Sequence, residues 1–286
     1  MIVGERQQGF LFVLPAVVVL AVFIAYPLVS TGMLSVTDAR GRFTGLENYI
    51  EMIESPRTAR ATRNTIYYVG VSVLFQLAIG TAAGILLNER FRGQALMRSL
   101  TLIPWVVPGI VAAMTWAWMF HTDFGIINFA LQRIAAIEEP LGWLTNPQTV
   151  LPALTAVNVW KMFPFVAVMV LAGLQAIPTS LYEAARVDGA SFWHEIRYVT
   201  LPQLRPILMA ITLLLLIAGV NSITIIYATT RGGPADRSLI TSIQIFVEAF
   251  EQNRFNASSA LSVMFFTVST AMILLYVRVG DRREAA

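Results

Sequence analysis

The stretch ILMAITLLLLIAGVNSITIIYATT, residues 207–230, carries no charged side chain along its whole length. The hydrocarbon core of a bilayer is about 30 Å thick, and a helix needs about 20 consecutive apolar residues to cross it. Lys161 is the one charged residue in the five further stretches that meet this requirement, which are residues 10–33, 66–87, 100–120, 150–173 and 257–277. The sequence therefore predicts an all-α membrane protein with six transmembrane helices, and we treat residues 1–286 as one transmembrane domain.

The composition excludes several other classes of protein. Charged residues make up 13% of the chain, whereas soluble domains usually carry about 25%. The chain contains no cysteine, and its two histidines, His121 and His194, have no second metal-ligating side chain at a suitable spacing. No run of basic residues resembles a nucleic-acid contact surface. We therefore expect membrane lipid as a partner, no metal site and no nucleic acid.

Arginine supplies nineteen of the twenty basic residues, and Lys161 is the one lysine. A phosphate-binding loop needs the pattern G-x-x-x-x-G-K-[ST], in which the lysine reaches the phosphate groups of a nucleotide. Lys161 instead follows Trp160 within an apolar stretch. The sequence also contains no cluster of acid, base and nucleophile. We therefore expect no catalytic residue, no enzymatic activity and no cofactor bound by this chain.

An even number of spans places both termini on one side of the membrane, together with the connections 88–99 and 174–205. Cytoplasmic connections usually carry an excess of arginine and lysine, but this side has ten arginines and the opposite side has nine. The short, arginine-dense connection 88–99 and the tail RVGDRR, residues 278–283, favour a cytoplasmic location for both termini. On the opposite side, residues 43–53 and 124–137 are predicted to form short surface helices.

Residues 175–202, QAIPTSLYEAARVDGASFWHEIRYVTLP, predict a helix, a turn and a second helix that leads into the fifth span. Ser180 and Glu183 have the spacing of a capping box at the start of the first helix. Gly189 suits the end of that helix, because glycine adopts a positive φ without strain. Ser191 is placed to cap the second helix. We expect a rigid loop whose aromatic surface is suited to a partner protein and is formed by Tyr182, Phe192, Trp193 and Tyr198.

The same segment closely resembles the EAA loop of ABC importer permeases. That pattern is E-A-A, a glycine four residues after the second alanine, then a hydrophobic residue, any residue, and L-P, and it is matched by Glu183, Ala184, Ala185, Gly189, Val199, Leu201 and Pro202. In this family the loop forms a coupling helix that docks in a groove of an ATP-binding subunit. By resemblance, the residues that couple to the ATPase are Tyr182, Glu183, Ala184, Ala185, Asp188, Gly189, Phe192, Trp193, Leu201 and Pro202.

Further segments resemble the first permease subunit of maltose-type sugar importers. The turn TTRGGP at residues 229–234 has the T-x-G-G-P pattern of that subunit, and ALSV at residues 260–263 also fits. The extra N-terminal spans and the large external domain of the maltose subunit find no match in this sequence. The resemblance implies a type I ABC importer permease fold in the cytoplasmic membrane of a bacterium or archaeon.

The resemblance also implies the remaining components of an importer. They are a second homologous permease subunit, two copies of a cytoplasmic ATP-binding subunit that bind ATP and Mg, and an external solute-binding protein. The solute is implied to be a carbohydrate or a carbohydrate derivative. ATP would close the ATPase pair, and the EAA loop would pass this movement to the spans as a rigid-body shift.

In the maltose-type first subunit, the spans on either side of the EAA loop contact the sugar. By resemblance, and with Asn221 added as a neighbour, the substrate path is expected to contain Asn158, Lys161, Met162, Phe165, Leu215, Ala218, Gly219, Asn221 and Ser222. The first four have the spacing i, i+3, i+4, i+7 and therefore share one face of a helix. Ala218 and Gly219 stand where the family has an aromatic residue and an asparagine, which is a departure from the maltose pattern.

Lys161 is unusual, because an ionisable side chain at the centre of a span costs at least a few kcal/mol. Such a group usually faces a cavity and a partner, although a lysine stem also permits its ammonium to reach the outer interface. The corresponding family position is commonly occupied by an uncharged residue. We therefore predict a solute that carries negative charge or is unusually polar. The alternative is that Lys161 only donates to sugar hydroxyls.

An ion-coupled secondary transporter is the alternative function. Such transporters use carboxylates or histidines inside the membrane as relays. The six stretches contain no aspartate and no glutamate. The sequence therefore favours the ATP-driven importer over the ion-coupled transporter.

Overall fold

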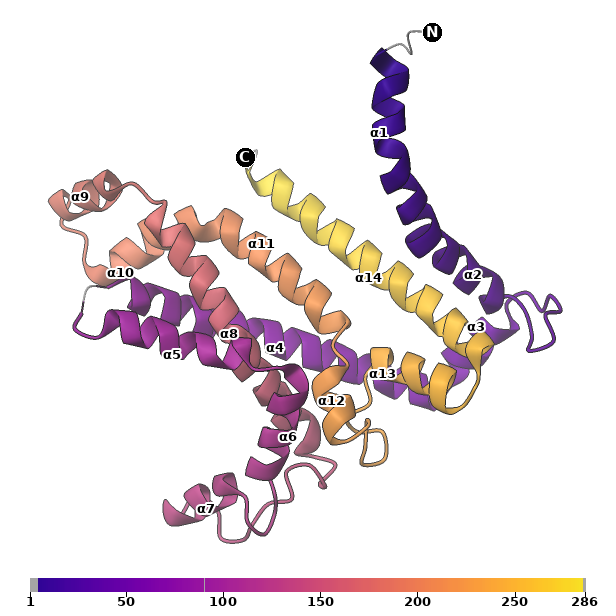
Figure 1. Cartoon of the computed structure of the whole chain (residues 1–286). Coiled ribbons are helices and arrows are strands. Elements are labelled where there is room, and N and C mark those ends of the chain that lie inside the picture. The colour runs from indigo at the N-terminus through magenta and orange to yellow at the C-terminus, as the bar shows by residue number, and fades with distance from the viewer. Residues whose placement is uncertain (1–4, 90, 285–286) are drawn as a thin grey trace. The chain divides into compact units, whose positions relative to one another are not determined.

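The computed structural model describes residues 5–89 and 91–284, and this part of the chain is folded almost entirely into helices (Figure 1). The helices are α1 (Glu5–Leu20), α2 (Tyr26–Ser35), α3 (Glu47–Glu54), α4 (Pro56–Asn88), α5 (Gln94–Val106), α6 (Gly109–Met119), α7 (Ile126–Arg133), α8 (Val150–Gln175), α9 (Thr179–Val187), α10 (Phe192–His194), α11 (Leu201–Val220), α12 (Thr224–Thr229), α13 (Thr241–Phe246) and α14 (Phe255–Glu284). Three π-helical turns continue α1, α10 and α13, and they are η1 (Ala21–Ala25), η2 (Glu195–Thr200) and η3 (Val247–Glu251).

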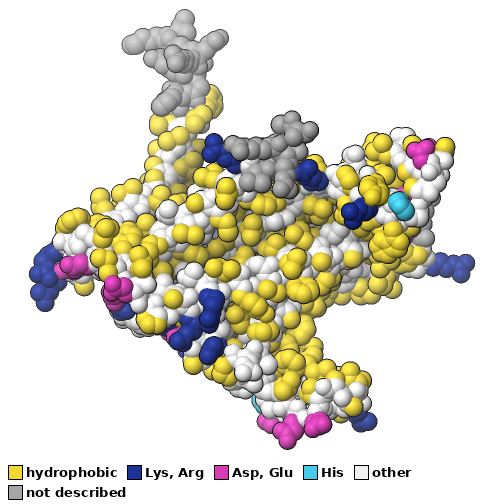
Figure 2. Space-filling model, turned by 180° about the vertical axis from the view of Figure 1, so that it is seen from behind, with side chains coloured by type: hydrophobic (Ala, Val, Ile, Leu, Met, Phe, Trp, Pro, Cys, Tyr) yellow, Lys and Arg dark blue, Asp and Glu magenta, His cyan; other side chains and the backbone are white. Residues whose placement is uncertain are grey.

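The helices confirm the predicted multi-span membrane protein. Within the described residues, five segments are long and apolar enough to cross a bilayer, and they are Phe12–Ser35, Pro56–Asn88, Val150–Gln175, Phe192–Thr229 and Phe255–Arg278. α5 and α6 meet the same test as a bent pair, which gives up to six spans. Figure 2 shows apolar side chains over most of the visible face, with charged side chains mainly at its edges. An apolar surface of this extent fits contact with lipid or with another membrane protein.

The third predicted span, residues 100–120, is broken. α5 ends at Val106, α6 begins at Gly109, and the two helices are bent by 95°. Pro108 accounts for the break, because proline lacks a backbone N–H and disfavours helical geometry in the residue before it. That residue, Val107, has a ψ of 128°. The stretch predicted as the third span is therefore formed by two helices, which together meet the test for a span.

The fifth predicted span, residues 207–230, is also interrupted, since α11 ends at Val220 and α12 begins at Thr224. At its other end the helix extends beyond the prediction, because α10, η2 and α11 follow one another without a break. Pro202 lies in the first turn of α11, as predicted. The two predicted surface helices are present as α3 and α7.

The described residues pack as two compact units, one formed by the chain up to residue 59 with residues 244–270 and the other by residues from 60 to 243 with those from 271 onward. In the first unit, α3 and the start of α14 enclose the buried residues Met52, Ala257 and Leu261. Asn256 donates to the carbonyl oxygen of Thr37 at 2.8 Å. These contacts tie the connection after α2 to the start of α14. The single domain over residues 1–286 is not tested by this division and stays a prediction.

A buried ion cluster adds to the first unit. The side chain of Glu248, which is 3% exposed, lies 3.3 Å from Arg57 Nη1 and 3.0 Å from Arg254 Nη1. Arg254 also pairs with Glu51. The carboxylate of Glu248 therefore has two cations as compensation for its burial.

α8 lies inside the second unit, in contact with α5, α6, α11 and α12. Its side chains Val166 and Val170 are fully buried and lie against α4 at Gly80 and Gly84. The absence of a β-carbon at these glycines lets the two helix backbones approach closely, as is common for helix pairs in membranes.

α9 and α10 lie at one end of the second unit, and α6 and α7 lie at the other (Figure 1). The connection after α4 lies at the same end as α9, since Asn88 and Glu89 share a cavity with Tyr182 and Arg186. This agrees with the prediction that the connections 88–99 and 174–205 lie on one side. The cytoplasmic location of that side, and of both termini, stays a prediction.

Candidate functional site

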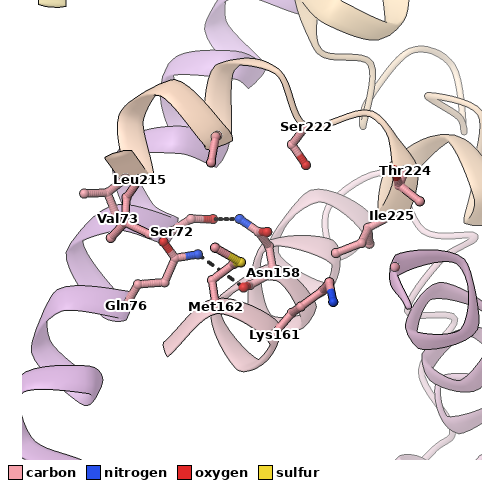
Figure 3. A pocket seen from close by; sticks show the side chains of 13 residues that line it. Ser72, Val73, Gln76, Asn158, Lys161, Met162, Leu215, Ser222, Thr224 and Ile225 are labelled. Atoms are coloured by element: carbon pink, nitrogen blue, oxygen red, sulfur yellow. Dashed lines mark hydrogen bonds between the residues drawn. The ribbon is translucent and has the colours of Figure 1, made fainter. Parts of the chain in front are cut away.

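A cavity of about 290 Å³ lies in the second unit between α4, α6, α8, α11 and α12 (Figure 3). The residues that line it are Ser72, Val73, Gln76, Gly109, Asn158, Lys161, Met162, Leu215, Ala218, Gly219, Ser222, Thr224 and Ile225. α4, α8 and α11 each belong to a segment able to cross a bilayer. The cavity therefore lies between membrane-crossing helices, and it combines amide, hydroxyl and ammonium groups with apolar side chains.

One wall of the cavity is a hydrogen-bonded contact between α4 and α8. Asn158 Nδ2 donates to Ser72 Oγ at 3.1 Å, and Gln76 Nε2 donates to the carbonyl oxygen of Asn158 at 3.2 Å. Figure 3 shows these three residues joined by dashed lines, with Lys161 pointing away from them. All three residues of the contact are buried. Because buried amides need partners, the bond to Ser72 fixes the orientation of the Asn158 side chain, and the bond to the backbone of Asn158 fixes that of Gln76.

The end of α11, which packs against α4, forms another wall of the cavity. The hydroxyl groups of Ser222 and the fully buried Tyr68 are hydrogen-bonded at 3.3 Å. A β-carbon at Gly219 would lie 3.2 Å from Val69 Cγ1, which is a tight approach. Gly219, predicted for the substrate path, is thus also the residue that lets α11 approach α4 at this point.

Lys161 reaches from α8 to the break between α5 and α6. Its Nζ donates to the carbonyl oxygen of Val107 at 2.5 Å and to that of Trp105 at 3.5 Å. The last carbonyl groups of a helix have no partner within the helix, and a cation near them is favourable. Lys161 therefore lines the cavity and caps the end of α5 at the same time.

The structure brings seven of the nine residues predicted for the substrate path to this cavity, and they are Asn158, Lys161, Met162, Leu215, Ala218, Gly219 and Ser222. Phe165 does not line it, because Phe165 lies two helical turns beyond Asn158, where its ring is 6.0 Å from that of Trp105. Asn221 does not line it either, because this exposed residue folds back and donates to the carbonyl oxygen of Ile217 at 2.8 Å. Contact between any of the nine and a solute stays a prediction.

The contribution of α4 to the cavity was not predicted from the sequence. Ser72 and Gln76 are four residues apart, so they lie on the same face of the helix. Two polar side chains at this spacing inside an apolar stretch could have indicated a wall that faces protein or a cavity instead of lipid.

The loop from α9 to η2 contains eight of the ten residues predicted to couple to an ATPase, and the other two, Leu201 and Pro202, begin α11. Gly189 ends the turn after α9 with a φ of +82°, as predicted. The predicted capping box was wrong, because α9 begins directly after Pro178 and has no side-chain cap. Pro178 has an extended ψ of 131° and takes the cap position itself, which places Ser180 inside the first turn.

Ser191 is at the start of α10, as predicted, but its side chain does not cap the helix. Its Oγ is instead hydrogen-bonded to His194 Nδ1 at 2.6 Å. Two contacts tie α9 to this second helix. Arg186 Nε donates to Glu195 Oε1 at 2.8 Å, and the hydroxyl groups of Tyr182 and Thr200 lie 3.2 Å apart. The hydrogen bond to Glu195 raises the pKa of Arg186, so the arginine stays charged at any physiological pH.

The exposed surface of this loop is aromatic. Trp193 is 74% exposed and Phe192 is 53% exposed, and their rings meet edge to face at 5.6 Å. Also exposed are Glu183, Ala184 and Asp188, which precede these rings in the sequence, and Leu201 and Pro202, which follow them. Large exposed aromatic side chains are typical anchors of protein interfaces.

Three comparisons with known proteins bear on this arrangement. Residues 76–284 match the family described as "Binding-protein-dependent transport system inner membrane component". The trehalose/maltose transport system permease protein MalF of Thermococcus litoralis is 34% identical over 98% of this chain and 96% of its own length. The sulfoquinovosyl glycerol transport system permease protein SmoG of Agrobacterium fabrum is 33% identical over 96% of this chain and 91% of its own length.

The fold also has a counterpart among solved structures. A chain of a bacterial ABC transporter involved in the import of the acidic polysaccharide alginate matches with a TM-score of 0.87 and 20% sequence identity, over 98% of this chain and 97% of that chain. At 20% identity, the match shows that the two chains share a fold. The predicted type I importer permease fold is thereby confirmed.

Proposed function

This chain belongs to the family of inner-membrane components of binding-protein-dependent transport systems, and on that premise we propose that it is one of two permease subunits of an ATP-driven importer for a carbohydrate or carbohydrate derivative. As a multi-pass component of the inner membrane, it would form the translocation path together with a second, homologous permease subunit. The ion-coupled transporter considered from the sequence is disfavoured by the family relationship.

The carbohydrate class is supported by relatives and by the chemistry of the cavity. The relatives named above are assigned to trehalose/maltose and to sulfoquinovosyl glycerol, and each of these is a saccharide or a saccharide derivative. A saccharide presents many hydroxyl groups and some apolar C–H surface. The cavity offers Asn158, Ser222 and Thr224 as polar partners beside apolar walls of Leu215 and Ile225, a mixture typical of small-molecule sites.

The coupling role is supported by the loop from α9 to η2. This loop presents the exposed rings of Phe192 and Trp193 on a scaffold that the Arg186–Glu195 ion pair braces. We propose that it docks on a cytoplasmic ATP-binding subunit and transmits the closure of two such subunits to α8 and α11. ATP and Mg would be bound by those partners, and an external solute-binding protein would deliver the solute.

One observation carries the proposal. Seven of the residues predicted for the substrate path line one cavity, and the two spans that supply them, α8 and α11, are joined by the aromatic loop. The test is copurification of the chain with its second permease subunit and its ATP-binding subunit. We expect Trp193→Ala to release the ATP-binding subunit while the permease pair stays intact. Phe124→Ala is the matched control, because Phe124 is an exposed aromatic residue, 68% accessible, in the connection between α6 and α7.

Normal recovery of the ATP-binding subunit with the Trp193→Ala variant would refute the docking role of the loop. Failure of the unaltered chain to associate with any ATP-binding subunit would refute the importer itself.

A further inference from the structure

Among the described residues that line the cavity, Lys161 is the one charged side chain, and neither aspartate nor glutamate lines it. The Lys161 Nζ has two hydrogen-bond acceptors, the carbonyl oxygens of Val107 and Trp105. Carbonyl groups at the end of a helix carry only a partial negative charge, about −0.5 for the whole terminus. The hydrogen-bonding needs of the ammonium are therefore met in part, while its full positive charge has no anionic partner in the cavity.

The two acceptors lie at the break between α5 and α6. Val107 is the residue after α5, and Pro108 cannot donate a hydrogen bond to close the gap. Backbone carbonyls inside a membrane need a partner, and Lys161 supplies it from the facing helix. The ammonium is held at a place that a solute in the cavity can also reach, since Gly109, directly after the break, lines the same cavity.

Gly109 keeps this place open. A β-carbon there would lie 3.9 Å from Lys161 Cε and 3.2 Å from Thr224 Cγ2. A larger residue would fill the space between α8 and α12 beside the ammonium. The cavity is thus accessible next to its one cation.

We propose that the transported solute carries an anionic group, a carboxylate or a sulfonate on a saccharide, which binds the Lys161 ammonium in exchange for the carbonyl oxygen of Val107. This inference rests on the proposed function and names the substrate class of the same cavity. Binding of the anion neutralises the uncompensated charge and withdraws the cap from the break between α5 and α6. Binding of the solute would thereby change the hydrogen bonding at the bend between α5 and α6, which lies in the wall of the path.

A purely structural role for Lys161 predicts a different outcome. If the lysine only caps α5, its loss would impair the transport of every solute to the same degree. If it also binds the anion, its loss would impair anionic solutes selectively. The ratio between an anionic solute and its neutral counterpart separates the two roles, and selectivity contributed by the solute-binding protein is the same for all variants.

The experiment has two stages and uses the complete importer. First, thermal shift of the solute-binding protein is screened with disaccharides that differ at one position, a glucuronate or a 6-sulfonated hexose in place of the neutral hexose. Second, uptake of the best anionic probe and of its neutral counterpart is measured in proteoliposomes for the unaltered chain, Lys161→Met and Lys161→Arg. We expect Lys161→Met to lower the anionic-to-neutral uptake ratio about tenfold, which corresponds to about 1.4 kcal/mol. Lys161→Arg should restore much of the ratio, because it keeps the charge.

Each other outcome is decisive. A binding protein that takes neutral saccharides alone would overturn the inference and leave the proposed function standing. An equal loss of uptake for both probes in Lys161→Met would also overturn it and leave Lys161 as a cap. A binding protein and an importer that accept no saccharide at all would overturn the carbohydrate function as well.

Discussion

Gly84 of α4 lies so close to Val170 of α8 that a β-carbon at this glycine would fall 2.8 Å from Val170 Cγ1. One turn earlier, a β-carbon at Gly80 would fall 2.6 Å from Val166 Cγ1. The same two helices hold the hydrogen-bonded wall of the cavity through Ser72 and Asn158. The distance between α4 and α8 at that wall therefore depends on two glycines that lie further along α4, outside the cavity.

We expect Gly84→Ala to destabilise the permease by about 1–3 kcal/mol, because overpacking forces helices apart or side chains out of their rotamers. Gly70→Ala is the matched control, since a β-carbon at Gly70 on the same helix meets nothing within 4 Å. The control should be neutral or slightly stabilising, because alanine favours helix over glycine. Thermal unfolding of the detergent-solubilised complex measures both variants. Equal unfolding temperatures would show that the contact between α4 and α8 is looser than described.

Gly189 should tolerate asparagine and reject valine. Its φ is +82°, and a β-carbon would meet nothing within 4 Å, so the penalty comes from the backbone alone. That penalty is roughly 1–2 kcal/mol for an ordinary residue, whereas asparagine visits this region more readily. We expect Gly189→Val to reach the membrane but to lose association with the ATP-binding subunit and uptake, and Gly189→Asn to keep both. Normal uptake by an assembled Gly189→Val importer would argue against a coupling role for the turn.

The ion pair between Arg186 and Glu195 should tolerate an exchange of its two charged residues. Arg186→Glu places two carboxylates together and is expected to weaken binding of the ATP-binding subunit, and the double variant Arg186→Glu, Glu195→Arg should recover it. The pKa of Arg186 is raised by the hydrogen bond to Glu195. A group whose pKa is raised in the folded protein contributes to stability fully at pH values below its ordinary pKa. That contribution is lost only as the pH rises through the higher pKa.

The contribution of Arg186 to the stability of the loop, and through it to binding of the ATP-binding subunit, should therefore not change between about pH 6 and pH 9. Affinity for the ATP-binding subunit, measured across that range, checks both statements. A double variant as weak as Arg186→Glu alone would show that the loop needs these particular charges and not only the brace.

Glu248 should matter more to the stability of the first unit than Glu51 does. Glu248 is 3% exposed and lies between two arginines, whereas Glu51 is 53% exposed. Removal of one partner from a buried ion pair costs about 3–5 kcal/mol, because the remaining charge is left uncompensated. An exposed pair contributes about 0–1 kcal/mol. Thermal unfolding of Glu248→Gln and Glu51→Gln should differ accordingly, and similar values would mean that solvent reaches the cluster.

Hydrophobic run length predicted the membrane-crossing segments well, because a bilayer imposes one length on every span. It could not locate the break at Val107. Pro108 removes one donor, but whether a helix kinks or stops depends on what compensates the freed carbonyls. Here the compensating donor is Lys161, 54 residues later in the chain. A long-range partner of this kind is not visible in the local pattern.

The turn at Gly189 was predictable, because the requirement for positive φ is local. The capping box was wrongly predicted because the local sequence allows more than one start for the helix. Pro178 and Ser180 are both acceptable near a helix start, and the sequence alone did not decide between them. The cavity was predicted from two spans by resemblance, whereas the α4 wall with Ser72 and Gln76 depends on how α4 packs against α8.

We propose that this chain forms the membrane path of an ATP-driven, binding-protein-dependent importer. The direct measurement is uptake of a radiolabelled saccharide into proteoliposomes that contain this chain, the second permease subunit and the ATP-binding subunits, with the solute-binding protein supplied on the opposite side. We predict accumulation only when ATP and the solute-binding protein are both present, and its loss when this chain carries Gly189→Val. Accumulation that is driven by a proton or sodium gradient without ATP would contradict this proposal.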